Sequence, residues 1–131
     1  MSNKKLITDD GKTELLRLGF KSEEAGGSFS FLALGGPNST GAQDENFVEV
    51  SGSGYQRVQT VIDSLEDKTI TISGIFDESN YAPESGMIKE IGLCNSDIHD
   101  GTETFFMYSE VPPIYKTSDI SLQYTIIISI D

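Results

Sequence analysis

The sequence has no tryptophan, one cysteine and one histidine, and each shortage excludes a class of site. Cys94 has no second cysteine with which to form an internal disulfide, which suits synthesis in a reducing cytoplasm. Any Ser-His-Asp triad, Cys-His pair or histidine-rich metal site would have to use His99. Without tryptophan or other obvious exposed aromatics, the sequence does not support a carbohydrate-stacking groove.

Basic residues are also scarce, with 9 Lys and Arg against 21 Asp and Glu, for a net charge of −12. A surface with this much negative charge repels the phosphate backbone of nucleic acids and the anionic headgroups of lipids. We therefore expect no nucleic-acid partner and no membrane partner. No apolar run reaches the roughly 18 residues of a membrane-spanning helix. Residues 1–5 suggest a flexible tail, and Leu6-Ile7 is too short an apolar stretch for a secretory signal. The 131 residues are expected to form one domain, 1–131.

The first regular element is predicted to be a helix from Asp9 to Leu18. Thr8, Asp9 or Asp10 can cap its N-terminus, where the helix dipole also favours carboxylates. Gly19 is expected to end the helix as a left-handed residue. Leu15, Leu18 and Phe20 are expected to lie against the core.

The rest of the chain has the alternation of strands separated by polar loops. Residues 35–46 are almost free of apolar side chains and predict a long exposed loop, and Pro112-Pro113 is expected to end a strand. The clearest alternation is that of the last segment, 120–130. Together the pattern predicts a mainly β protein, an antiparallel β-sandwich with a short N-terminal α-helix. The expected strands are 28–34, 55–62, 68–76, 87–94, 105–111 and 120–130, with a short extended piece at 47–50.

No sequence motif strongly indicates a catalytic or metal-binding site. Asp97, His99 and Asp100 lie close enough in sequence to approach one cation, but their types are those of a polar turn. Cys94 ends an apolar strand and is expected to be a buried thiol. We therefore assign no catalytic residue, cofactor or metal ligand, and we expect no small-molecule ligand. Three pairs of adjacent carboxylates fall in predicted loops, where solvation explains them better than catalysis or calcium binding: Glu23-Glu24, Asp44-Glu45 and Asp77-Glu78.

Several segments, in order, resemble the N-terminal domains of bacteriophage tail-fibre and tail-collar proteins. The first has the pattern threonine–acid–x–glycine followed by paired leucines, and another has isoleucine–x–glutamate–isoleucine–glycine–leucine. A third is similar to the glycine–x–glycine–tyrosine–x–arginine stretch of small phage virion proteins. The segments are 7–16, 31–36, 48–58, 88–94, 105–116 and 121–130.

The resemblance implies a non-enzymatic virion protein of the tail, baseplate or tail-fibre attachment point, made in the bacterial host cytoplasm. Its partners would be other phage virion proteins and further copies of itself. A capsid-decorating or head-fibre-base protein is an alternative location, and a small acidic calcium-dependent module or enzyme is an alternative of another class. Aromatic side chains dominate interface energetics, so Tyr55, Phe106 and Tyr115 are candidate interface residues, and Leu15 is added from the apolar face of the predicted helix.

Overall fold

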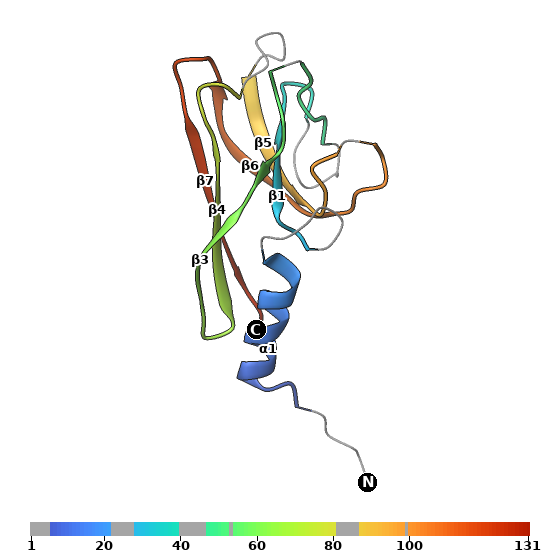
Figure 1. Ribbon diagram of the computed structural model, residues 1–131, viewed down its shortest axis with the longest axis vertical. Coiled ribbons are helices and arrows are strands. Elements are labelled where there is room, and N and C mark those ends of the chain that lie inside the picture. The colour runs from blue at the N-terminus through green and yellow to red at the C-terminus, as the bar shows by residue number, and fades with distance from the viewer. Residues whose placement is uncertain (1–5, 22–27, 40–46, 53, 81–86, 99) are drawn as a thin grey trace.

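The computed structural model describes residues 6–21, 28–39, 47–52, 54–80, 87–98 and 100–131. These described residues form one helix and seven strands, and the strands are arranged as two antiparallel sheets (Figure 1). One sheet has the strand order β2-β1-β5-β6 and the other has the order β3-β4-β7. This confirms the mainly β sandwich with a short N-terminal helix. The elements are α1 (Asp9–Phe20), β1 (Phe31–Gly35), β2 (Val58–Gln59), β3 (Val61–Glu66), β4 (Thr69–Phe76), β5 (Met87–Cys94), β6 (Phe105–Tyr115) and β7 (Leu122–Ser129).

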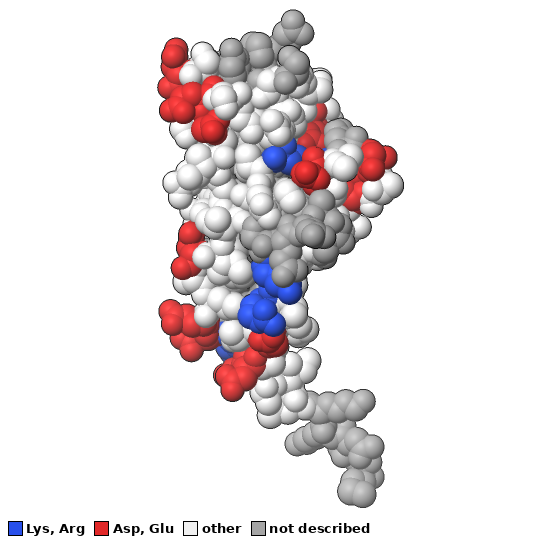
Figure 2. Space-filling view, in the orientation of Figure 1, with Lys and Arg blue, Asp and Glu red and all other residues white. Residues whose placement is uncertain are grey.

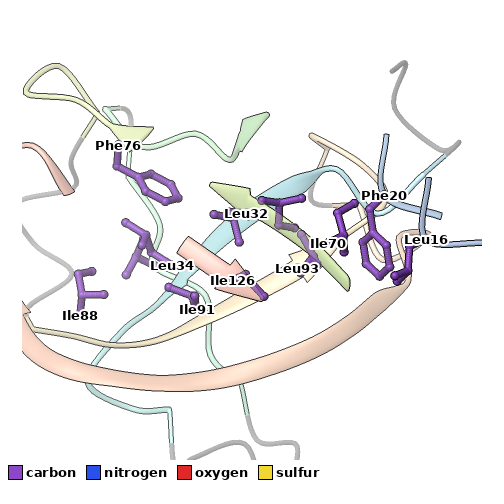
Figure 3. Close-up of a cluster of buried hydrophobic side chains, with 12 residues drawn as sticks. Leu16, Phe20, Leu32, Leu34, Ile70, Phe76, Ile88, Ile91, Leu93 and Ile126 are labelled. Atoms are coloured by element: carbon purple, nitrogen blue, oxygen red, sulfur yellow. The ribbon is translucent and has the colours of Figure 1, made fainter. Parts of the chain in front are cut away.

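The core lies between the two sheets and continues to α1 (Figure 3). The alternation of strand residues places one set of side chains inward, as the pleat of a strand requires. In β4 the inward residues Ile70, Ile72 and Phe76 are fully buried. At the α1 end, Leu16 and Phe20 lie near Ile70 and Leu93 in Figure 3.

Helix α1 begins where the sequence predicted and ends later. Thr8 is the N-cap, and its hydroxyl oxygen accepts a hydrogen bond from the Gly11 N–H at 2.9 Å. The prediction that Gly19 ends the helix in a left-handed conformation is wrong: Gly19 is helical and the last helical residue is Phe20. The longer helix places Phe20 in the core.

The predicted inner face of α1 is wrong for two of its three residues. Leu15 and Leu18 are 56% and 49% exposed, whereas Leu16 and Phe20 are buried. Thr13 lies on the buried side, where its hydroxyl accepts a hydrogen bond from the Lys68 N–H at 2.8 Å. That bond ties α1 to the β3–β4 turn, so the sheet determines which of the adjacent leucines turns inward.

The predicted strand 55–62 is divided in the structure. Only Val58–Gln59 pairs with β1, and after Thr60 the chain enters the other sheet as β3. The N–H of Thr60 donates to the Ser30 carbonyl oxygen at 2.8 Å, which holds the crossing point. The β3–β4 hairpin then turns through Asp67 and Lys68, both with left-handed backbones (φ 51° and 53°). Two such residues form a type I′ turn, whose twist matches that of paired strands.

Strand β6 runs through Pro112-Pro113, contrary to the prediction that the prolines would end it. β6 is an edge strand, where a missing N–H breaks no pairing on the open side. The pairing with β5 also shifts there: Ile88 lies opposite Ile114 and Glu90 lies opposite Glu110, so three residues of β6 oppose Lys89 alone. The shift accommodates both prolines within the strand.

Both faces of the larger sheet are covered at β1. Every residue of this strand is buried, those that point away from the other sheet as well as those that point toward it. The predicted long exposed loop therefore begins differently: Gly35, Gly36 and Ser39 are buried, and residues 40–46 lie outside the described residues. An aromatic cluster of Phe47, Phe105 and Tyr108 packs with ring centroids 5.0–5.4 Å apart.

The aromatic cluster packs directly against the backbone of Gly92, so a side chain at this position tests how close the packing is. A Cβ at Gly92 would lie 2.7 Å from the Phe105 ring and 3.3 Å from the Phe47 ring. Since Phe105 is held by its neighbours, we expect Gly92→Ala to lower the free energy of unfolding by about 1–3 kcal/mol in urea denaturation. Gly19→Ala is the control, because its Cβ would meet nothing within 4 Å. It should stabilise the protein by roughly 0.5–1 kcal/mol. A neutral Gly92→Ala variant would contradict the close packing.

Candidate functional site

The four candidate interface residues lie in different environments. Leu15 is exposed on α1. Phe106 and Tyr115, near opposite ends of β6, are 46% and 60% exposed. Phe106 packs its ring against Phe20 at 4.8 Å between centroids. Tyr55 is half-buried, and its hydroxyl is committed to internal hydrogen bonds, so of the four it has the least surface to offer. The interface assignment stays a prediction.

Helix α1 presents an apolar stripe to the outside. Leu15 and Leu18 are 56% and 49% exposed, and Ile7, which precedes the N-cap Thr8, is 61% exposed. Leu15 and Leu18 are three residues apart and share one side of the helix, opposite the side that Leu16 and Phe20 bury. The helix is therefore apolar on both sides, and only one of them is covered by the described part of the chain.

The smaller sheet has an outer face without charge along two of its strands. Neither β4 nor β7 contains a charged residue. Their outward side chains are mainly threonine and serine, together with Ile75 and Ile127, which are 53% and 68% exposed. Acidic residues on the face seen in Figure 2 gather at the ends and loops, and the surface over the middle of the strands is largely uncoloured. We call the outward side of β4 and β7 the neutral face.

A buried cluster of charges lies apart from the neutral face, next to the larger sheet. Arg57 forms ion pairs with Glu49 and with Glu103, each at 2.7 Å, and the three side chains are only 2%, 4% and 5% exposed. The guanidinium carbon of Arg57 also lies 5.4 Å from the centre of the Phe105 ring. The cluster joins the segments 47–57 and 95–103, which come from distant parts of the chain.

Every N–H group of the Arg57 guanidinium has an acceptor within the protein. Nε and Nη2 donate to the two oxygens of Glu49 at 2.9 and 2.7 Å, and Nη2 also donates to Glu103. Nη1 donates to the carbonyl oxygens of Ser96 and Ile98 at 3.2 and 3.0 Å. Arginine has five such N–H groups, and all are used, so Arg57 holds the loops in place and has none left for a substrate anion.

Tyr55 extends this cluster. Its hydroxyl donates to Glu49 Oε2 at 2.5 Å and accepts from the Leu34 N–H at 3.0 Å. Burial and the adjacent Glu49 charge raise the pKa of Tyr55, so it stays a neutral phenol. Burial alone would lower the pKa of Arg57, but its carboxylate partners outweigh that effect and raise it. These protonation states are fixed, which suits a structural role.

This cluster was not among the sites predicted from the sequence. Glu49 lies between Val48 and Val50, and Arg57 lies between Gln56 and Val58 in a predicted strand. A single charge within a predicted extended segment is the signal that could have indicated buried partners. Glu103 carries no such signal, because it lies in a polar loop.

The cluster predicts a specific pH dependence. Burial raises the pKa of Glu103, but the hydrogen bond and charge of Arg57 outweigh it and hold the pKa below its usual value. A carboxyl whose pKa is lowered by folding stabilises the fold at neutral pH and loses that contribution as the pH falls through the folded pKa. We expect stability to fall less steeply from about pH 5 to 3 in Glu103→Gln than in the wild type, by at most about 1.4 kcal/mol per pH unit.

Urea denaturation at several pH values measures this slope. Glu66→Gln is the control, since Glu66 is exposed at the end of β3, and it should keep the wild-type slope. If Glu103→Gln also kept it, the ion pair with Arg57 would not govern the titration of Glu103.

The loop carboxylates serve local turns. Asp77 Oδ1 accepts from the N–H and hydroxyl of Ser79, and Asp100 Oδ1 accepts likewise from Thr102. These hydrogen bonds lower the pKa of both aspartates. Among the residues that the structure describes, no group of three or more His, Cys, Asp or Glu side chains is arranged to hold a metal ion. His99, Glu23-Glu24 and Asp44-Glu45 lie outside the described residues.

Cys94 is buried, as predicted. Its side chain is completely inaccessible, and its thiol donates to the Ser96 carbonyl oxygen at 3.3 Å. Burial raises the pKa of the thiol. Cys94 therefore behaves as a small core residue.

Comparison of the chain with protein-family models, with curated proteins and with solved structures found no match. Within the described ranges, α1 is the only helix, and no helix has the length and apolar character needed to cross a membrane. Function is therefore inferred from the surfaces and contacts of this chain.

Proposed function

We propose that this protein is a non-enzymatic structural component of a bacteriophage virion, at the tail, baseplate or tail-fibre attachment point, and that it acts by symmetric assembly. The observation that carries the assembly role is the neutral face, an uncharged surface with exposed Ile75 and Ile127 on a chain of net charge −12. Acidic copies repel one another wherever their carboxylates face each other. A region without charge is where such copies can approach closely.

The exposed apolar stripe of α1 gives a second surface of the same kind. Leu15 and Leu18 lie on α1, and Ile7 comes just before its N-cap, so this stripe is at the end of the sandwich, next to the C-terminus (Figure 1). A specific joint needs roughly 800 Å² on each partner. Two separate surfaces allow one contact between identical copies and another to a neighbouring virion protein.

The virion part of the proposal is supported by the resemblance of ordered segments to phage tail proteins. Two of these segments correspond to a pair of neighbouring strands. Segment 88–94 lies in β5, and segment 105–116 contains β6 and the residue that follows it. The use of all five Arg57 N–H groups within the fold supports a structural role for this cluster rather than the binding of a substrate anion. The structural role of Arg57 and the two uncovered surfaces are the features of a sandwich that binds its partners through its surface.

Two measurements test the proposal. Light scattering across a range of protein concentrations should give a mass above that of one 14.3 kDa chain. An antibody against the protein should detect it in purified particles of the phage that encodes it, and electron microscopy should place it at the tail. A strict monomer that is absent from particles would overturn the proposal, and a position on the capsid would assign it to decoration instead.

A further inference from the structure

Strand β7 lies at an edge of the smaller sheet. It is the last strand of the order β3-β4-β7, and among the residues that the structure describes no strand pairs with its outer edge. Along these eight residues, every second one therefore directs its backbone N–H and C=O groups to this outer edge. Such a row is a template for another strand.

The other three edge strands carry features that oppose such pairing. β2 has two residues, and β3 has a bulge between Ile62 and Ser64 together with the acidic Asp63 and Glu66. β6 has two prolines, Glu110 and two shifts in its pairing. Short length, bulges, proline and charge are the devices by which proteins protect sheet edges.

β7 has none of these devices. It contains no proline and no charged residue, and its pairing with β4 runs without a shift over its whole length. Leu122, Tyr124 and Ile128 face inward yet are only half-buried at this edge. A further strand beside β7 would complete both the hydrogen bonding of the edge and the burial of these side chains.

We propose that β7 pairs antiparallel with β7 of a second copy of this chain, across a two-fold axis near Thr125, to form one continuous six-stranded sheet. This inference rests on the proposed assembly role and adds a contact at the edge of the neutral face. A second copy fits because both strands are uncharged, so the acidic chains meet where neither carries a carboxylate. When a strand pairs with its own copy across a two-fold axis, the open edge of each copy is covered by the other. Assembly at this contact therefore gives a dimer and goes no further.

The matched variants are Thr125→Glu in β7 and Ser64→Glu in β3. Both residues are exposed and lie in edge strands of the same sheet, and both changes add one negative charge. Two copies of Thr125→Glu would bring like charges together near the axis, which destabilises a strand pair. Sedimentation velocity should show a wild-type dimer, a dissociation constant raised at least about tenfold in Thr125→Glu, and little change in Ser64→Glu.

Hydrogen–deuterium exchange on the wild type gives an independent result, even if Thr125→Glu folds poorly. The amides of 122–129 should become more protected as the protein concentration rises. A dimer that Thr125→Glu does not weaken, with no such protection in 122–129, would overturn this inference and leave the assembly role standing. A monomer at all concentrations that is also absent from virions would overturn both. Protection of 122–129 only on adding another protein would replace the second copy by that partner.

Discussion

Replacing Arg57 by alanine is expected to lower the free energy of unfolding by about 3–5 kcal/mol, and the thermal midpoint by roughly 12–20 °C. The substitution removes the cation from a cluster in which Glu49 and Glu103 are 4% and 5% exposed. Both carboxylates would stay buried beside Tyr55 with their charge uncompensated. The carbonyl oxygens of Ser96 and Ile98 would also lose their shared donor. Calorimetry and urea denaturation measure the loss.

Arg17→Ala is the matched control. Arg17 also pairs with a glutamate, Glu14, at 2.5 Å, but the two side chains are 46% and 53% exposed. Solvent-exposed pairs contribute only about 0–1 kcal/mol, so this variant should resemble the wild type. Arg57→Lys keeps the charge and loses the planar fork, and it should lie between the two. Equal effects at Arg57 and Arg17 would show that burial of the cluster contributes nothing.

Replacing Leu16 by alanine is expected to cost about 2–5 kcal/mol. Leu16 is 2% exposed and packs with Phe20 at the end of the core (Figure 3). A helix of twelve residues depends on such packing, because isolated helices of this length are marginal in water. Circular dichroism should show α1 lost or frayed along with the fall in stability measured by urea denaturation.

Leu15→Ala tests the same helix without touching the core. Leu15 is adjacent to Leu16, has the same side chain and is 56% exposed. We expect its effect on stability to stay within about 0.5 kcal/mol, whereas any role of the apolar stripe in assembly would appear as a change in mass. If Leu15→Ala destabilised the monomer as much as Leu16→Ala, the orientation of α1 would be wrong.

Much of the architecture was predictable because strand alternation is a local property. Strand β5 was predicted with both of its ends, and β4 and β7 with errors of one or two residues at some ends. The alternation noted for 120–130 also appears in β7, where Tyr124 and Ile126 face the core and their neighbours are exposed. In each case the alternating pattern alone distinguishes the two faces.

The errors lie where a distant contact decides the conformation. The orientation of α1 follows from the bond between Thr13 and the Lys68 N–H, fifty-five residues away in sequence. The continuation of β6 through Pro112-Pro113 depends on its edge position and on the extra residues opposite Lys89. The division of 55–62 depends on Thr60 bonding to Ser30. A window of neighbouring residues does not contain these partners.

The candidate functional surfaces and clusters also include features that the sequence determines and features that only the tertiary structure decides. The scarcity of catalytic and basic side chains, the net charge of −12 and the uncharged final strand are properties of composition and residue order, so the sequence by itself determines them. The cluster around Arg57 and the open edge of β7 were decided only by the tertiary structure. Both depend on which segments become neighbours, and that is set by the packing of two sheets rather than by local preference.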